Sequence, residues 1–291
     1  MGDPTIDADV GLGTAYERLA VYALLDRWFA DAGLRSALEG PVDGMAGMPG
    51  LHLIGLARQG TNVTVALPDT RALEIVRRTY RWLGIEERLT TLCTADPLEI
   101  PGQFDLVLTY NALPLVEDWR SYLTRLTALA ARSLLVSVTN PFSYGVKLRR
   151  MQRTLEPRRT PELFDHPSTR DAELRPTLDR LGTIEESAFV DCPWWPDLFV
   201  PTGQTLWQGT LGRLPGLGAL VRNRLAARAR PGRFTYAPER FPLFPGQPGH
   251  DELTKALARH PVFDQRGAWL GAAFGHHRAH RMRVSAPKAP A

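Results

Sequence analysis

The sequence is poor in cysteine, in lysine and in long hydrophobic runs. Its two cysteines, Cys93 and Cys192, provide neither a disulfide framework nor a Cys-x-x-Cys metal site. No apolar run is long enough to span a bilayer. Residues 1–7 are acidic and lack the basic and then apolar regions that mark a secretory signal. We therefore expect a cytoplasmic protein without a transmembrane segment.

The sequence also lacks the motifs of several nucleotide-binding and hydrolytic enzymes. A Walker-type loop requires a lysine, and the first lysine of the chain is Lys147. The segment Gly11-Leu12-Gly13 precedes a helix instead of following a strand, and Tyr16 stands where a nicotinamide fingerprint has its third glycine. No Gly-x-Ser-x-Gly nucleophile elbow occurs. These absences argue against the enzyme classes that depend on those motifs.

The charge is positive but dispersed. A net charge of +4 raises the question of an anionic partner. The basic residues are nearly all arginine and are spread along the whole chain among many alanines, which indicates compositional bias. A nucleic-acid footprint would need them clustered, so we do not expect a nucleic-acid partner. Hydrophobic residues at 44% and charged residues at 23% fit a globular protein of one large domain or two smaller ones.

Apolar segments alternate with helical patterns along the first half of the chain. The spacing of apolar residues predicts helices over about residues 15–32, 50–59, 70–83 and 117–131. The segments between them are near-continuous apolar runs, which are typical of a parallel sheet covered on both faces. Together they predict a doubly wound α/β sheet. The predicted strands are Ser36–Glu39, Asn62–Leu67, Leu89–Thr94, Phe104–Thr109 and Ser133–Thr139.

The second half of the chain is less regular. Its pattern predicts helices up to about Thr154, over Ser168–Leu181, over residues 203–230 and over Asp251–Arg259, and strands over Ile184–Asp191 and Gly275–Val284.

The segment from Leu38 to Asp105 carries the most information. A strand ending at Leu38-Glu39-Gly40 is followed by a glycine-rich turn, a helix and a second apolar strand. This order builds the nucleotide pocket of an open α/β sheet. Over roughly residues 1–140 the order and spacing resemble class I S-adenosylmethionine-dependent methyltransferases.

The resemblance implies a Rossmann-like, mostly parallel seven-stranded sheet whose last strand is antiparallel. About 80 residues separate the last two predicted strands, which is long for a connection without a role. We interpret that region as an inserted, mostly helical cap. The predicted organisation is an N-terminal arm and helix (1–35), a cofactor-binding core (36–193), the inserted cap (194–273), and a last core strand with a tail (274–291).

The resemblance also implies S-adenosyl-L-methionine as the cofactor. Glu39 holds the acidic position that ends the first strand, and the turn supplies Gly40, Gly44 and Gly47, which let the backbone approach a ligand closely. The turn departs from the family pattern at Pro41, where a glycine is common. A tight turn that holds no ligand is the alternative interpretation.

Three further residues complete the expected cofactor set. The family ends its second strand with an acid that binds the ribose, but Leu67 stands there; Asp69, two residues on, either reaches the ribose or caps the next helix. The resemblance implies that Asp96 accepts from the adenine amino group, and a turn before Pro97 is its alternative role. Asn111, in Asn111-Ala112-Leu113, follows the fourth strand at the same edge of the sheet.

The acceptor end is less well defined. Methyl transfer is an in-line displacement that depends mainly on alignment, and a base is needed only when the nucleophile carries a proton. Candidate bases are His166, Asp191, His276 and His277; a capped turn or a solvated imidazole is the alternative for each. We predict no metal site, because His276 and His280 share a strand face without a third ligand.

Together these features predict methyl transfer to a small-molecule acceptor. An Asn-Pro-Pro-Tyr turn, common in family members that methylate nucleic-acid amino groups, is absent after the fourth strand. The alternative is a methyltransferase-like protein that has lost cofactor binding and serves as a partner or scaffold for another protein. Leu67 and Pro41 motivate that alternative.

Overall fold

The computed structural model describes residues 12–42, 44, 49–153, 162–190, 246–257 and 268–284. Gly47 and Asp191, both implicated by the sequence, lie outside these ranges, as does most of the predicted cap. The boundaries of that cap therefore remain a prediction.

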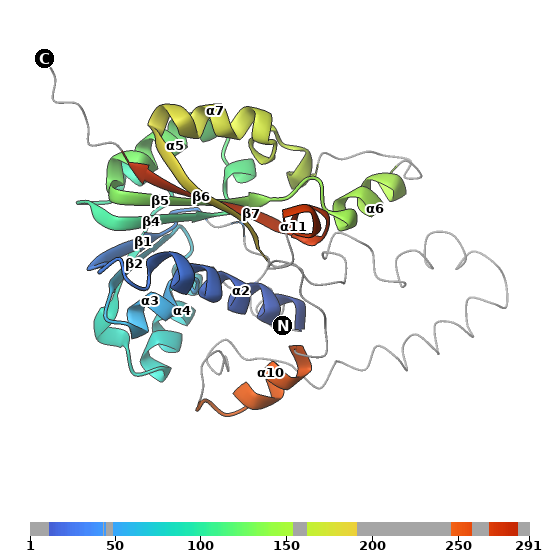
Figure 1. Ribbon diagram of the computed structural model, residues 1–291. Coiled ribbons are helices and arrows are strands. Elements are labelled where there is room, and N and C mark those ends of the chain that lie inside the picture. Colours follow the sequence, from blue (N-terminus) through green and yellow to red (C-terminus); the bar gives the residue numbers. More distant parts are fainter. Residues whose placement is uncertain are drawn as a thin grey trace, which may run out of the picture.

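A seven-stranded sheet forms the centre of the protein (Figure 1). The strand order is β3-β2-β1-β4-β5-β7-β6. β7 runs antiparallel to both of its neighbours, and the remaining pairs are parallel. This arrangement confirms the predicted doubly wound, mostly parallel sheet. The strands are β1 (Ser36–Glu39), β2 (Asn62–Leu67), β3 (Leu89–Cys93), β4 (Phe104–Tyr110), β5 (Ala130–Thr139), β6 (Gly182–Val190) and β7 (His277–Val284).

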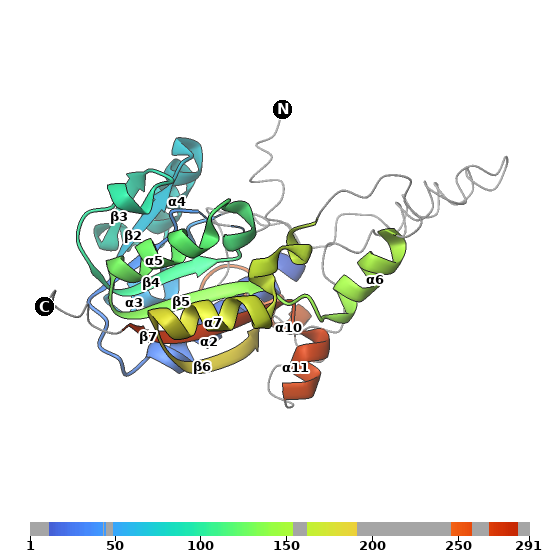
Figure 2. The same cartoon turned by 90° about the horizontal axis from the view of Figure 1, so that it is seen from above.

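Helices cover both faces of the sheet (Figures 1 and 2). One apolar cluster joins the sheet to α2 (Leu12–Phe29), α3 (Ile54–Arg58) and α4 (Thr70–Trp82). A second cluster, on the opposite face, joins it to α5 (Trp119–Leu129) and α7 (Asp171–Leu181). Three further helices are α6 (Tyr144–Arg153), α10 (His250–Leu257), which lies beside α2, and α11 (Ala268–Phe274), which contacts β6 and α6.

Short 3-10 turns connect several of these elements. They are η1 (Glu86–Arg88), η2 (Pro97–Glu99), η3 (Leu113–Leu115), η4 (Leu163–Asp165) and η5 (Pro167–Thr169). Among the helices in the described ranges, none combines the length and the apolar character that a bilayer crossing would need.

The observed bounds differ from the predicted ones where packing overrides local pattern. β5 begins at Ala130 rather than Ser133, because Ala130 pairs with Phe104 of β4. α7 begins at Asp171 rather than Ser168, because the His166 side chain accepts a hydrogen bond from the Ser168 amide and starts the η5 turn instead. Helix α11 was not predicted from the sequence.

Candidate cofactor site

The parallel strands end at one edge of the sheet, where open α/β folds bind their ligands. β1 lies between β2 and β4, so the chain order reverses beside β1. β7 begins at this same edge, because His277 pairs with Thr139 at the end of β5. The fold thus brings Glu39, Asn111 and His277 to one edge. The sequence pattern alone does not determine the edge at which an antiparallel last strand starts.

Two described glycines of the turn, Gly40 and Gly44, lie against the protein's own backbone. Gly40 has a φ of 107°, and a Cβ there would lie 2.1 Å from the carbonyl oxygen of Ala66. Gly44 donates its amide to the Tyr110 carbonyl at 2.9 Å, and a Cβ there would lie 2.0 Å from the carbonyl oxygen of Asn111. Both positions therefore require glycine for reasons internal to the fold, whether or not a ligand binds.

Glu39 is buried and holds the segment that follows the turn. One carboxylate oxygen accepts the His52 amide at 3.1 Å and lies 2.6 Å from Nδ1 of His52. The other oxygen accepts the Leu53 amide at 3.1 Å. Burial by itself would raise the pKa of Glu39, but the charge of His52 and the hydrogen bonds from His52 and Leu53 together lower that pKa below its usual value. Glu39 therefore stays ionised at neutral pH.

The His52 ring connects this pair to the other side of the site. It stacks on the Tyr110 ring with centroids 4.2 Å apart. The Tyr110 hydroxyl donates to Glu17 of α2 at 2.7 Å and lies 3.1 Å from Nδ1 of His277. Glu17, His52 and Tyr110 were missed by the sequence reasoning. The available signal was a histidine placed inside an apolar run directly after the glycine turn.

Asp69 and Asp96 both cap helical turns. Oδ1 of Asp69 accepts the Arg71 amide at 2.8 Å at the start of α4, and Leu67 is buried in the core. Oδ1 of Asp96 accepts the Leu98 amide at 2.9 Å and forms an ion pair with Arg125 at 3.5 Å. Within the described ranges, the second carboxylate oxygen of each makes no hydrogen bond. The capping roles are thus observed, and direct contacts with a ribose or an adenine remain predictions.

Asn111 joins three segments at the end of β4. Its backbone has a positive φ of 48°, a conformation that asparagine tolerates better than most residues. Its Oδ1 accepts from the amide and hydroxyl of Thr139 at 3.0 and 2.7 Å, and its Nδ2 donates to the Gly44 carbonyl at 3.3 Å. Its amide group therefore holds the turn and β5 in place, and contact with a cofactor remains a prediction.

His276 and His277 lie at the start of β7 and are buried. The carbonyl of His276 accepts the Asn140 amide at 2.7 Å. The Asn140 side chain donates to the carbonyls of Ala272 and Gly275 at 2.9 and 2.8 Å, so it connects the end of β5 to the chain that leaves α11.

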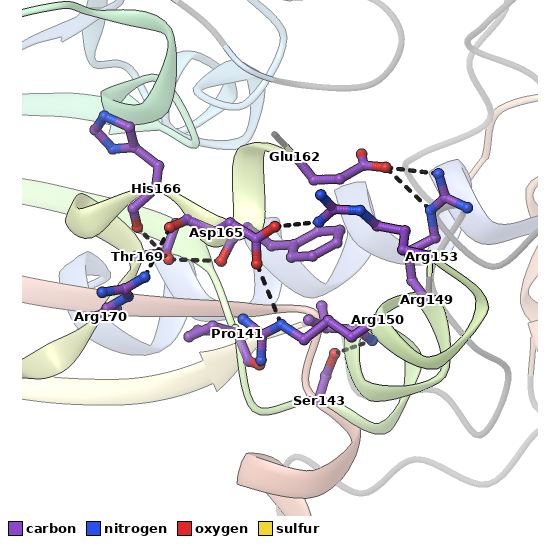
Figure 3. A network of polar contacts seen from close by, with 12 residues as sticks. Pro141, Ser143, Arg149, Arg150, Arg153, Glu162, Asp165, His166, Thr169 and Arg170 are labelled. Atoms are coloured by element: carbon purple, nitrogen blue, oxygen red, sulfur yellow. Dashed lines mark hydrogen bonds and ion pairs between the residues drawn. The ribbon is translucent and has the colours of Figure 1, made fainter. Parts of the chain in front are cut away.

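His166 stands apart from these two histidines, between η4 and η5. Its Nδ1 lies 2.8 Å from the Ser168 hydroxyl, and burial lowers its pKa below the usual value. Figure 3 shows its ring pointing away from the neighbouring Asp165, which accepts from Arg150 and Arg153 of α6. The described part of the chain contains no group of three His, Cys, Asp or Glu side chains arranged to hold a metal ion.

The strand order, with β7 antiparallel between β5 and β6, agrees with the sheet that the resemblance to class I methyltransferases implies. No family model matches the sequence, and no curated protein matches it. Solved structures similar to this chain include magnesium protoporphyrin IX methyltransferase (ChlM) from Synechocystis PCC 6803, at 20% identity over 61% of this chain and 78% of that chain, with a TM-score of 0.47.

Two further solved structures cover more of the chain. The StiE O-MT structure is 14% identical over 91% of this chain and 73% of that chain, with a TM-score of 0.46. The [4+2]-cyclase SpnF is 13% identical over 91% of this chain and 81% of that chain, with a TM-score of 0.48. These values describe distant similarity, and they assign neither a cofactor nor a substrate to this chain.

Proposed function

We propose that this protein transfers a methyl group from S-adenosylmethionine to a small-molecule acceptor. The observation that carries the proposal is the use of the backbone amides behind the glycine turn. The amides of His52 and Leu53, directly before α3, are both taken by the buried carboxylate of Glu39.

This arrangement distinguishes between cofactor classes. In nucleotide-binding α/β folds, the amides at this place bind phosphate. Here a buried, ionised carboxylate holds them, and it would repel a phosphate group. S-adenosylmethionine has no phosphate, so the residues fit it better than they fit a dinucleotide. The ionised Glu39 carboxylate therefore favours an adenosyl-sulfonium cofactor over another nucleotide at the same edge of the sheet.

We assign the contacts with the cofactor to two residues of the same edge, the exposed Asp69 and the half-buried Asp96. Asp96 would accept a hydrogen bond from the adenine amino group, and Asp69 would accept from the ribose hydroxyls. Each would use Oδ2, because Oδ1 accepts the capping amide. Glu39 and Asn111 would hold the turn rather than touch the ligand. When bound, S-adenosylmethionine supplies a methyl group on a sulfonium. The acceptor nucleophile attacks that methyl group, and S-adenosylhomocysteine leaves.

His276 and His277 lie at the same edge and are the candidate bases for an acceptor that carries a proton. Residues 194–273 would cover the acceptor.

Titration calorimetry tests the proposal. The wild-type protein should bind S-adenosylmethionine and S-adenosylhomocysteine with micromolar affinity and should not bind NAD. Asp96→Asn keeps a capping side chain but removes the charge, and it should weaken binding by about tenfold or more, as expected for the loss of a charge-assisted hydrogen bond.

Asp118→Asn is the matched control. Asp118 caps α5 through the Ser121 amide at 3.1 Å, as Asp96 caps η2, but it is not assigned to the cofactor. The affinity of the Asp118→Asn variant for S-adenosylmethionine should equal that of the wild type. Failure of the wild type to bind either adenosyl ligand would refute the proposal.

The second candidate is a non-catalytic protein of this fold that binds a protein partner. It is favoured by Leu67, an apolar and buried residue where the family has its ribose-binding acid, and by the capping roles of both aspartates. Absence of adenosyl binding in the same titration would select this candidate.

A further inference from the structure

A continuous set of side-chain contacts crosses the candidate site from one face of the turn to the start of β7. We call it the His52 cluster and define it as Glu17, Glu39, His52, Tyr110 and His277. Its members come from α2, β1, the segment before α3, β4 and β7, and no sequence pattern paired any of them with another. Tyr110 and His277 are 167 positions apart in the chain.

One half of the His52 cluster holds the backbone after the glycine turn. Glu39 is 1% exposed and His52 is fully buried. The carboxylate receives three hydrogen bonds, two from backbone amides and one from Nδ1 of His52. A buried carboxylate is tolerated only when such partners satisfy it. Loss of the Nδ1 partner would leave Glu39 short of a donor in a dry site.

The other half connects that backbone to distant elements. His52 stacks on Tyr110 with an interplanar angle of 26°. The Tyr110 hydroxyl in turn contacts Glu17 and His277, and the rings of Tyr110 and His277 have centroids 5.1 Å apart. His52 therefore contacts both the Glu39 carboxylate and the Tyr110 ring.

We propose that His52 is a positioning residue for the cofactor turn: through Glu39 it fixes the backbone behind the turn, and through Tyr110 it aligns that backbone with the start of β7. The inference rests on the proposed function. His52 does not touch the cofactor; it sets the affinity by holding the turn in the binding conformation. His52 acts through the contact of its Nδ1 with Glu39 and through the stacking of its ring on Tyr110, and not merely by filling space.

Two substitutions separate these contributions. Asparagine places an amide nitrogen close to the position of the His Nδ1, so His52→Asn keeps the donor to Glu39. Leucine is similar in size but has no donor, so His52→Leu removes the side-chain donor and leaves Glu39 with its two backbone amides. We expect His52→Leu to weaken S-adenosylhomocysteine binding at least tenfold and His52→Asn to stay within about threefold of the wild type. Tyr110→Phe keeps the stack and should fall between them.

A matched control comes from a buried histidine that lies outside the His52 cluster. His280 is 1% exposed and lies 2.8 Å from the Ser187 hydroxyl, outside the His52 cluster. His280→Asn repeats the chemical change at equal burial, and it should leave the affinity unchanged. If both His52 variants lose the same amount of ligand affinity, and if that loss follows their loss of thermal stability, then His52 serves packing alone. That result would overturn the inference.

Hydrogen exchange across residues 49–58 makes the test independent of ligand. His52→Leu should speed exchange of the His52 and Leu53 amides, and His52→Asn and His280→Asn should not. If the wild type binds the ligand and these amides exchange at the same rate in all variants, the positioning role is refuted while the proposed function stands. If the wild type binds neither adenosyl ligand, the proposed function fails and the cofactor-positioning role fails with it.

Discussion

Two histidines of this protein are equally buried but lie in opposite electrostatic surroundings. His52, at the glycine turn, contacts the Glu39 carboxylate at 2.6 Å. His280, in β7 on the opposite face of the sheet, contacts the neutral hydroxyl of Ser187 and lies near Arg278. The turn region therefore pairs its buried histidine directly with an anion, whereas the charges near His280 are those of Arg278, Asp171 and Arg175, and its hydrogen-bond partner is a hydroxyl.

The comparison shows that burial alone does not decide charge. At His280, burial and then the Arg278 charge lower the pKa to about 4; the Asp171 charge opposes them, and Arg175 adds a smaller lowering effect. At Glu39, burial disfavours the charged form, but His52 and two amides reverse the effect. The partners within hydrogen-bond distance determine which buried group stays ionised.

The largest expected effect is the loss of stability when alanine replaces a glycine of the turn that lies against strand backbone. Gly40 and Gly60 have nearly the same φ, +107° and +101°, but only Gly40 has a backbone oxygen, that of Ala66, 2.1 Å from the position of a Cβ. Gly60→Ala should cost about 1–2 kcal/mol for the left-handed conformation alone. Gly40→Ala should cost roughly 3 kcal/mol or more, because strand backbone must also move. Urea unfolding of both variants measures the difference. Equal losses would contradict the close approach of the turn to β2.

The second expected effect is a pH dependence of stability that arises from the lowered pKa of His280. A group whose folded pKa is about 4 and whose unfolded pKa is 6.5 takes up its proton first in the unfolded state. The free energy of unfolding is therefore fully supported above pH 6.5 and decreases as the pH falls toward 4, by up to about 3 kcal/mol. His280→Asn removes this contribution. The wild-type and variant stability curves should diverge between pH 6.5 and 4, and parallel curves would contradict the assignment.

The smallest effect compares two buried tyrosines, Tyr22 of α2 and Tyr80 of α4. Tyr22 donates to the Leu51 carbonyl at 2.5 Å, whereas the fully buried Tyr80 hydroxyl makes no hydrogen bond with any residue that the structure describes. Tyr22→Phe should cost about 1 kcal/mol, and Tyr80→Phe should be neutral or slightly stabilising. Thermal unfolding with matched urea titrations checks both. A clear loss in Tyr80→Phe would mean that a bound water or ligand uses that hydroxyl.

The core of the sheet was predictable because its signals are local. The bounds of β1 and β2 agree with the predicted strands, since apolar runs between turn residues indicate buried strands. The capping role of Asp69, one of its two predicted roles, is observed for the same reason. α11 was missed because its seven residues include Gly271, a poor helix former, which lies close to Phe189 of β6.

The candidate site shows the same difference between features that are local in the sequence and features that depend on the tertiary structure. The sequence by itself determined the residue types at the ends of the strands, including Glu39, Asp96 and Asn111, and the glycines between them. Only the tertiary structure decided their partners: Glu39 with His52, Gly44 with Asn111, and Tyr110 with His277. The physical reason is that periodicity and capping act over a few residues, whereas these contacts form only after the strand order has brought distant segments to one edge of the sheet.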